Sequence, residues 1–148
     1  MDLSSPVAEV DGTLLALAVN PPLSLALLVA ASLHVLLIGD HASESSFLAA
    51  GFLAAGVGQL ALATLVAVQP SKPVYRAAIV LDVSLVLLYL GHVLVGIPLP
   101  TGSGFEFEFS PRESLDLAGV STVVAELVAV ALAYAGLLRK PRPQTAAD

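Results

Sequence analysis

The sequence predicts an all-α fold, a four-helix transmembrane bundle, and three observations support this prediction. Of the 148 residues, 57% are hydrophobic and only 12% are charged, whereas soluble domains are about 45–50% apolar. The apolar residues gather in four stretches, each long enough to cross a hydrocarbon core about 30 Å thick at about 1.5 Å per residue. None of these stretches alternates with the period of two that a membrane β-barrel requires.

The first span is interrupted by prolines near its beginning. Apolar character starts at Thr13, stops at the Asn-Pro-Pro sequence of residues 20–22, and then resumes. Because proline is well tolerated in the first turn of a helix, we place the first span at about 22–39. Residues 13–19 are then an interfacial or short packed helix. One kinked helix starting at Thr13 is the alternative.

Three further spans follow, each ended by proline or basic residues. They cover about 47–68, 74–97 and 115–138. All four spans belong to a single membrane domain, 13–138. A polar N-terminus, 1–12, precedes this domain. A basic and polar tail, 139–148, follows it, and we expect this tail to be disordered. In the last loop, Phe and Glu alternate over residues 105–109, which predicts a short extended segment on the outer surface.

The basic residues predict the orientation. Lys and Arg in short loops prefer the cytoplasmic side, and five of the six bases lie either around the second loop or after the fourth span: Lys72, Arg76, Arg139, Lys140 and Arg142. We therefore expect both termini inside the cell and the loops 40–46 and 98–114 outside it. The chain is predicted to be an integral protein of a prokaryotic plasma membrane, with the lipid bilayer as its surroundings.

Composition excludes several classes of function. There is no Cys, so a metal would have to be bound through nitrogen or oxygen. A net charge of −6 with only six bases argues against nucleic acid or an anionic lipid surface as a partner. The sequence has no nucleophile motif, phosphate-binding loop or cofactor fingerprint, and an enzyme is therefore not favoured.

Two histidines lie inside the predicted spans. His34 and His92 each lie five residues before the outer end of a span, so their imidazoles are expected at similar depth, where they can face each other across the bundle. An imidazole pair can bind a divalent metal or haem, or relay protons. The simpler interpretation is that each ring hydrogen-bonds a backbone carbonyl or a hydroxyl group.

Four other polar residues are also expected within the membrane, where ionisable groups are costly. Gln59 and Glu126 lie near the middle of their spans, which predicts a hydrogen bond between helices. Asp82 and Tyr89 lie seven residues apart and so nearly on one helical face, in a loose strip with His92. Alternatively, Asp82 pairs with a nearby basic residue, either Arg76 or Lys72.

A second group of candidate metal ligands lies at the outer rim. Asp40, His41 and Glu44 lie in the loop that follows the span of His34. Asp116 opens the fourth span on the same side of the membrane. Such nitrogen and oxygen ligands suit a divalent metal. Asp116 equally suits a helix N-terminus, where its charge opposes the positive end of the dipole.

The run from His34 to Gln59 resembles a family of small uncharacterised four-helix prokaryotic integral membrane proteins. The residues that carry the resemblance are His34, Asp40, His41, Glu44, Gly51, Phe52 and Gln59, then the turn Gly96, Ile97, Pro98 and Pro100, and finally Asp116 and Glu126. The resemblance implies the four-helix fold without an assigned activity.

Two functions follow from these patterns. The first is a small membrane protein that binds a metal or haem near its outer face through His34 and His92. The second is a non-catalytic accessory or scaffold subunit, in a homo-oligomer or a larger membrane complex, whose polar residues serve helix packing. Rows of small residues in the second span, Ala50, Ala54 and Gly58, favour close helix packing. A transporter is less favoured, because no inverted repeat or broken helix pair is present.

Overall fold

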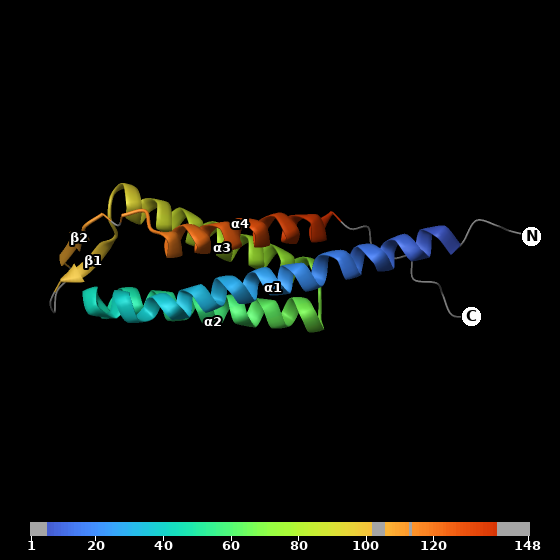
Figure 1. The fold of residues 1–148 in the computed structure, drawn as a ribbon, viewed down its shortest axis with the longest axis horizontal. Helices are drawn as coiled ribbons and strands as arrows, with labels where there is room; N and C mark the ends of the chain where they lie inside the picture. Colours follow the sequence, from blue (N-terminus) through green and yellow to red (C-terminus); the bar gives the residue numbers. More distant parts are fainter. Residues whose placement is uncertain (1–5, 102–105, 113, 139–148) are drawn as a thin grey trace, which may run out of the picture.

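The predicted four-helix bundle is confirmed by a computed structural model, which describes residues 6–101, 106–112 and 114–138. The elements are α1 (Pro6–Glu44), α2 (Ser46–Val68), α3 (Lys72–Leu94), β1 (Pro98–Thr101), β2 (Glu106–Phe109) and α4 (Leu117–Leu137) (Figure 1). Each helix contains a stretch long and apolar enough to cross a membrane, and in α1 this stretch is Asn20–Glu44. Length and composition therefore identify an integral membrane protein. The predicted tail lies outside the described residues.

The helices form two hairpins that pack on each other. Helix α1 lies along α2, and α3 lies along α4 (Figure 1). The two hairpins are joined mainly through α1 and α4, and the contact between α2 and α3 is the smallest among the four pairs of neighbouring helices. The strands and the α1–α2 turn lie at one end of the bundle, here called the strand end, and α1 extends beyond the other helices at the opposite end (Figure 1).

The first helix differs from the prediction. Helix α1 starts at Pro6 and continues without a break through Pro21 and Pro22, whereas the sequence analysis placed a helix start at the prolines. Two adjacent prolines remove two backbone donors. A complete break would leave more backbone groups without partners, and in an apolar environment each of these costs several kcal/mol. A continuous helix therefore satisfies more hydrogen bonds than two separate ones.

The loop expected at 40–46 is a turn with a single non-helical residue. Helix α1 continues to Glu44, and α2 begins at Ser46. Ser45 is the N-cap between them, and its hydroxyl oxygen accepts a hydrogen bond of 3.2 Å from the amide of Phe47. Serine is a favoured N-cap for this reason. The short turn holds the ends of α1 and α2 close together.

Helix α3 ends at Leu94, three residues before the expected Ile97. Gly96 has a positive φ of 94°, and its amide donates to the carbonyls of Gly91 and His92, both at 3.1 Å. A Cβ atom at this position would collide with the backbone carbonyl oxygen of Ser110. Glycine is therefore required here both by the backbone angle and by the close approach of the chain that follows β2.

The alternating Phe–Glu segment is extended, as predicted, over residues 106–109. Strand β2 pairs antiparallel with β1, and Pro98 lies opposite Phe109. The hydroxyl oxygen of Ser110 accepts from the Ile97 amide at 3.0 Å, and the Ser110 amide donates to the Ile97 carbonyl at 2.9 Å. These bonds fix Ile97 where the chain leaves α3.

The half of the bundle away from the strand end is closed by an apolar core. Its buried members come from all four helices: Leu23, Leu27, Ala63, Val66, Tyr75, Ala78, Ala129 and Ala133. The ring of Tyr75 packs against Gly136, where a Cβ atom would meet ring carbons at 3.0 Å. The Tyr75 hydroxyl donates to Asn20 at 2.7 Å. Because this half is filled by packed apolar side chains, we look for a ligand-binding site in the strand-end half.

Candidate functional site

A cavity of about 370 Å³ lies between the helices in the strand-end half of the bundle. This volume lies within the range of ligand pockets, about 300–1,000 Å³. Its walls are mostly apolar, and all four helices contribute. The lining residues are His34, Leu37, Phe47, Leu48, Gly51, Phe52, Ala55, Leu85, Leu88, Tyr89, His92, Ile97, Gly119, Thr122, Val123 and Glu126.

The cavity has an apolar rim on the side of α2 and α3. Phe47 of α2 and Leu88 of α3 line the cavity and are also exposed, by 57% and 55%. Gly51, another exposed lining residue, leaves space beside α2, because a Cβ atom there would meet nothing within 4 Å. Among neighbouring helices, α2 and α3 have the smallest contact, and the exposed lining residues lie on this side of the bundle.

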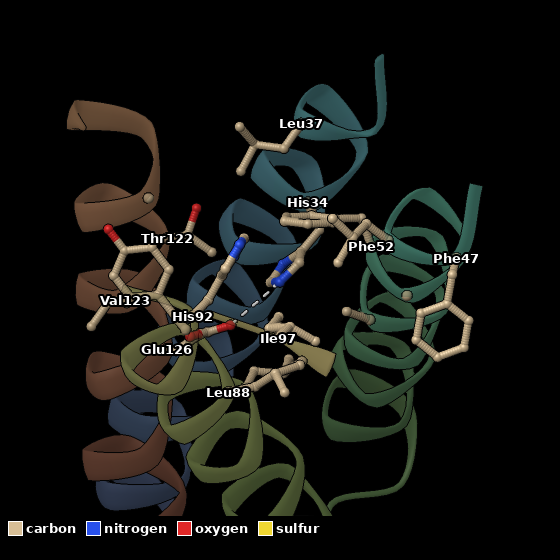
Figure 2. A pocket seen from close by; sticks show the side chains of 16 residues that line it. His34, Leu37, Phe47, Phe52, Leu88, His92, Ile97, Thr122, Val123 and Glu126 are labelled. Atoms are coloured by element: carbon tan, nitrogen blue, oxygen red, sulfur yellow. Dashed lines mark ion pairs between the residues drawn. The ribbon is translucent and has the colours of Figure 1, made fainter. Parts of the chain in front are cut away.

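Three ionisable side chains from three helices meet at the polar end of the cavity. His34 of α1, His92 of α3 and Glu126 of α4 are all buried, and their side chains point toward one another (Figure 2). The Nε2 atom of His34 lies 3.6 Å from Oε1 of Glu126. The sequence analysis placed the two histidines at similar depth, and both line this cavity.

The orientation of the His34 ring is fixed by the backbone. Its Nδ1 atom lies 3.0 Å from the carbonyl oxygen of Ala30, one turn earlier in α1. A carbonyl oxygen only accepts, so Nδ1 is the donor. In the neutral ring Nε2 is then an acceptor, and it is this atom that faces Glu126. The ring can therefore receive a proton, or share one with the carboxyl group, without losing its backbone bond.

Gln59 connects the cavity to the centre of the bundle. Its Nε2 donates to Oε1 of Glu126 at 3.4 Å, as the sequence predicted, and also to Oδ1 of Asp82 at 3.0 Å. His34, Gln59, Asp82 and Glu126 each come from a different helix, and each is nearly or fully buried. The four residues form one connected polar cluster across the bundle, here called the polar cluster.

Asp82 does not pair with Arg76 or Lys72, contrary to one of the two expectations. Lys72 and Arg76 are exposed, and the recorded partner of the Asp82 carboxylate is Gln59. Within the described part of the chain, Oε1 of Gln59 and Oδ2 of Asp82 are buried without a hydrogen-bond partner. Such atoms are costly in a low-dielectric interior, so the cluster is not optimised for packing alone.

Tyr89 and Thr122 complete the polar end. Tyr89 packs tightly on α4, because a Cβ atom at Gly119 would lie 2.7 Å from its ring and from its hydroxyl. Thr122 is buried one turn before Glu126, and its hydroxyl donates to the Ala118 carbonyl at 2.9 Å. Tyr89 was predicted from the sequence, whereas Thr122 was not. Its spacing of four residues from Glu126, which puts both on one helical face, is the signal that could have identified it.

The outer-rim residues have separate positions. His41 is buried in the last turn of α1, where its ring stacks on Phe52 with centroids 4.1 Å apart. Glu44 is exposed, and Asp116 is the N-cap of α4, where its Oδ1 accepts from the Gly119 amide at 2.7 Å. Among the described residues, no group of three or more His, Asp or Glu side chains is arranged to hold a metal ion. Metal binding stays a prediction.

Comparisons with known proteins give no relative. No known protein family, no curated protein and no solved structure matches this chain. The resemblance noted in the sequence therefore stays a prediction, and the case for a function depends on the geometry of the cavity and of the polar cluster.

Proposed function

We propose that the protein binds a lipophilic small molecule that enters the cavity from the bilayer. The observation that carries the proposal is a cavity of about 370 Å³ with apolar walls and ionisable side chains, His34, His92 and Glu126, at one end. Ligand pockets combine apolar walls with a few polar groups that fix orientation. The exposed apolar residues of the rim, Phe47 and Leu88, suit entry from among acyl chains.

The apolar core in the other half of the bundle favours binding over transport by a single chain. The polar cluster extends from the cavity to Asp82. On the side of Asp82 away from the cavity, the buried residues belong to the apolar core, which includes Leu23 and Leu27. A continuous polar path across the bundle would have to pass this core. We therefore favour a protein that holds its ligand in the membrane.

Labelling with azioctanol, a photoactivatable alcohol, tests the proposal. With the protein in phosphatidylcholine vesicles, we expect saturable labelling of lining residues such as Phe52 and Leu88, mapped by mass spectrometry. Gly51→Phe should fill the rim and abolish saturable labelling, because a side chain has space there. Gly39→Phe is the matched control, since Gly39 is also unobstructed and lies outside the cavity. Uniform, non-saturable labelling of the lipid-facing surface would refute the proposal.

Metal or haem ligation through His34 and His92 is a competing proposal with less support. Among the described residues, no group of three or more His, Asp or Glu side chains is placed to hold a metal ion. Elemental analysis and an optical spectrum of the purified protein decide the question. Roughly stoichiometric metal or a Soret band, lost in His34→Ala and His92→Ala, would favour ligation.

A scaffold function is the third candidate, and the surface of α2 favours it. Ala50 and Ala54 are exposed on this helix, and small residues on a lipid-facing surface let another helix approach closely. We expect a homo-oligomer or a complex to use this face. Native mass spectrometry of the wild type and of Ala54→Leu tests it, because loss of an assembled species only in the variant would support the candidate. A monomer in both samples would contradict it.

We further propose that both termini face the cytoplasm of a prokaryotic cell and that the strand end faces outward. The five bases near one membrane side support this orientation through their preference for the cytoplasm. The cavity then lies in the outer half of the membrane.

A further inference from the structure

The charges around the cavity are unbalanced. The carboxyl group of Glu126 lines the cavity. The carboxyl group of Asp82 does not line it, but it accepts a hydrogen bond from the same Gln59 amide as Glu126 does. None of the sixteen lining residues is Lys or Arg. Two carboxyl groups without a permanent cation make the site a better environment for positive than for negative charge.

The positive end of α4 does not change this balance. The helix begins beside the cavity, and Gly119 lines it. A free helix N-terminus attracts anions, but the Gly119 amide already donates to Oδ1 of Asp116 at 2.7 Å. The Asp116 carboxylate therefore occupies the position that an anionic headgroup would need.

The carboxyl group of Glu126 is loosely held. Its Oε1 atom lies 3.4 Å from Gln59 Nε2 and 3.6 Å from His34 Nε2. Bonds between a cationic nitrogen and a carboxylate are typically about 2.7–2.9 Å, and a carboxylate has about four acceptor positions. Glu126 therefore retains the capacity to accept a close bond from an ammonium group. In the low dielectric of the bundle, such a pair is much stronger than in water.

Aromatic rings supply further sites for a cation. Phe47, Phe52 and Tyr89 line the cavity together with Glu126. The faces of aromatic rings attract cations, and the attraction is stronger where water is excluded. An alkyl chain attached to the cation would contact the apolar wall formed by residues such as Leu85 and Leu88.

We infer that the ligand of this cavity is a lipophilic organic cation, of the class of protonated alkyl amines, whose ammonium group pairs with Glu126. The inference depends on the proposed function and adds the chemical class of the ligand. The ammonium donates to the Glu126 carboxylate, and the alkyl chain extends past the aromatic and aliphatic lining residues toward the rim between α2 and α3.

Competition against azioctanol labelling tests the inference with three compounds that differ only in headgroup. Decylamine is cationic near neutral pH, decanol is neutral, and decanoic acid is largely anionic. In phosphatidylcholine vesicles we expect decylamine to compete at a concentration at least about tenfold lower than decanol, because loss of a buried charge partner commonly costs more than a factor of ten in affinity. Decanoic acid should be the weakest competitor.

Two variants separate the site from general partitioning into the bilayer. Glu126→Gln should remove the advantage of decylamine, whereas Glu44→Gln should keep it, because Glu44 is exposed and lies outside the cavity. Asp82→Asn should reduce the advantage partially, and it serves as a second variant if Glu126→Gln fails to fold.

The outcomes distinguish the two proposals. If labelling is saturable and decylamine has no advantage over decanol, the cation inference fails while the proposed function stands. The inference also fails if the advantage survives in Glu126→Gln. If no saturable labelling occurs, both proposals fail.

Discussion

Gln59 is the residue on which the polar cluster depends. Its single amide nitrogen donates to two carboxyl groups from two other helices, and it is fully buried. The hydrogen bond to Glu126 follows from the sequence, because both residues lie near the middle of their spans. The bond to Asp82 does not, since Lys72 and Arg76 are nearer to Asp82 along the chain. Which partner Asp82 meets depends on the rotation of α3 about its axis, and packing sets this rotation.

Replacing Gln59 with leucine should destabilise the bundle. Gln59→Leu leaves Oδ1 of Asp82 and Oε1 of Glu126 without the amide donor, and hydrogen bonds between membrane helices are worth about 1 kcal/mol each. We expect a loss of about 1–2 kcal/mol in the free energy of unfolding, measured by circular dichroism during denaturation in sodium dodecyl sulfate. Thr64→Leu, on the exposed face of the same helix, should change the free energy of unfolding by much less. An unchanged unfolding curve for Gln59→Leu would show that the cluster contributes nothing to packing.

At the scale of elements, the contact of α3 with α4 depends on two tyrosines and two glycines. Tyr89 packs on Gly119, and Tyr75 packs on Gly136. Without a Cβ atom, α4 can approach each ring closely. A sequence shows these glycines but not their partners, because the pairing depends on how the two antiparallel helices align.

Adding a methyl group at Gly119 should disrupt this contact. A Cβ atom there would lie 2.7 Å from the ring and hydroxyl of Tyr89, and forced overpacking typically costs about 1–3 kcal/mol. We expect Gly119→Ala to lower the unfolding free energy by about that amount and to shift Tyr89. Thermal unfolding in detergent provides the measurement.

Gly91→Ala is the matched control for this change. A Cβ atom at Gly91 meets nothing within 4 Å, and alanine favours a helix over glycine by up to about 1 kcal/mol. Its stability should be equal to or greater than that of the wild type. If both variants behave alike, the tight contact of Tyr89 with Gly119 is not important for stability.

At the scale of the whole molecule, the bundle is divided into two structurally different halves. The half away from the strands contains the apolar core, and the strand-end half contains the cavity. The short turn at Ser45 and the β1–β2 hairpin lie at the same end as the cavity (Figure 1). In the proposed orientation, the cavity and the hairpin belong to the outer half of the membrane.

Single cysteines can test this orientation, because the natural chain has none. We expect Ser43→Cys, near the strand end, to react with a membrane-impermeant maleimide added to intact cells. Ser71→Cys, in the connection between α2 and α3 at the opposite end, should react only after the membrane is permeabilised. The reverse pattern would show that the termini lie outside.

The sequence by itself determined that the chain forms four membrane-length helices, because the length and apolarity of each span are local properties that no packing can reverse. It also identified five of the buried polar residues, His34, Gln59, Asp82, His92 and Glu126, since a strongly polar side chain within such a span stands out, whereas the buried Thr122 was missed. Only the tertiary structure decided that α1 continues through Pro21 and Pro22, that Asp82 meets Gln59, and that His34, His92 and Glu126 share one cavity. These features depend on the rotation, tilt and separation of whole helices. Contacts between distant residues set these quantities, and the spacing of residues along a single span does not record them.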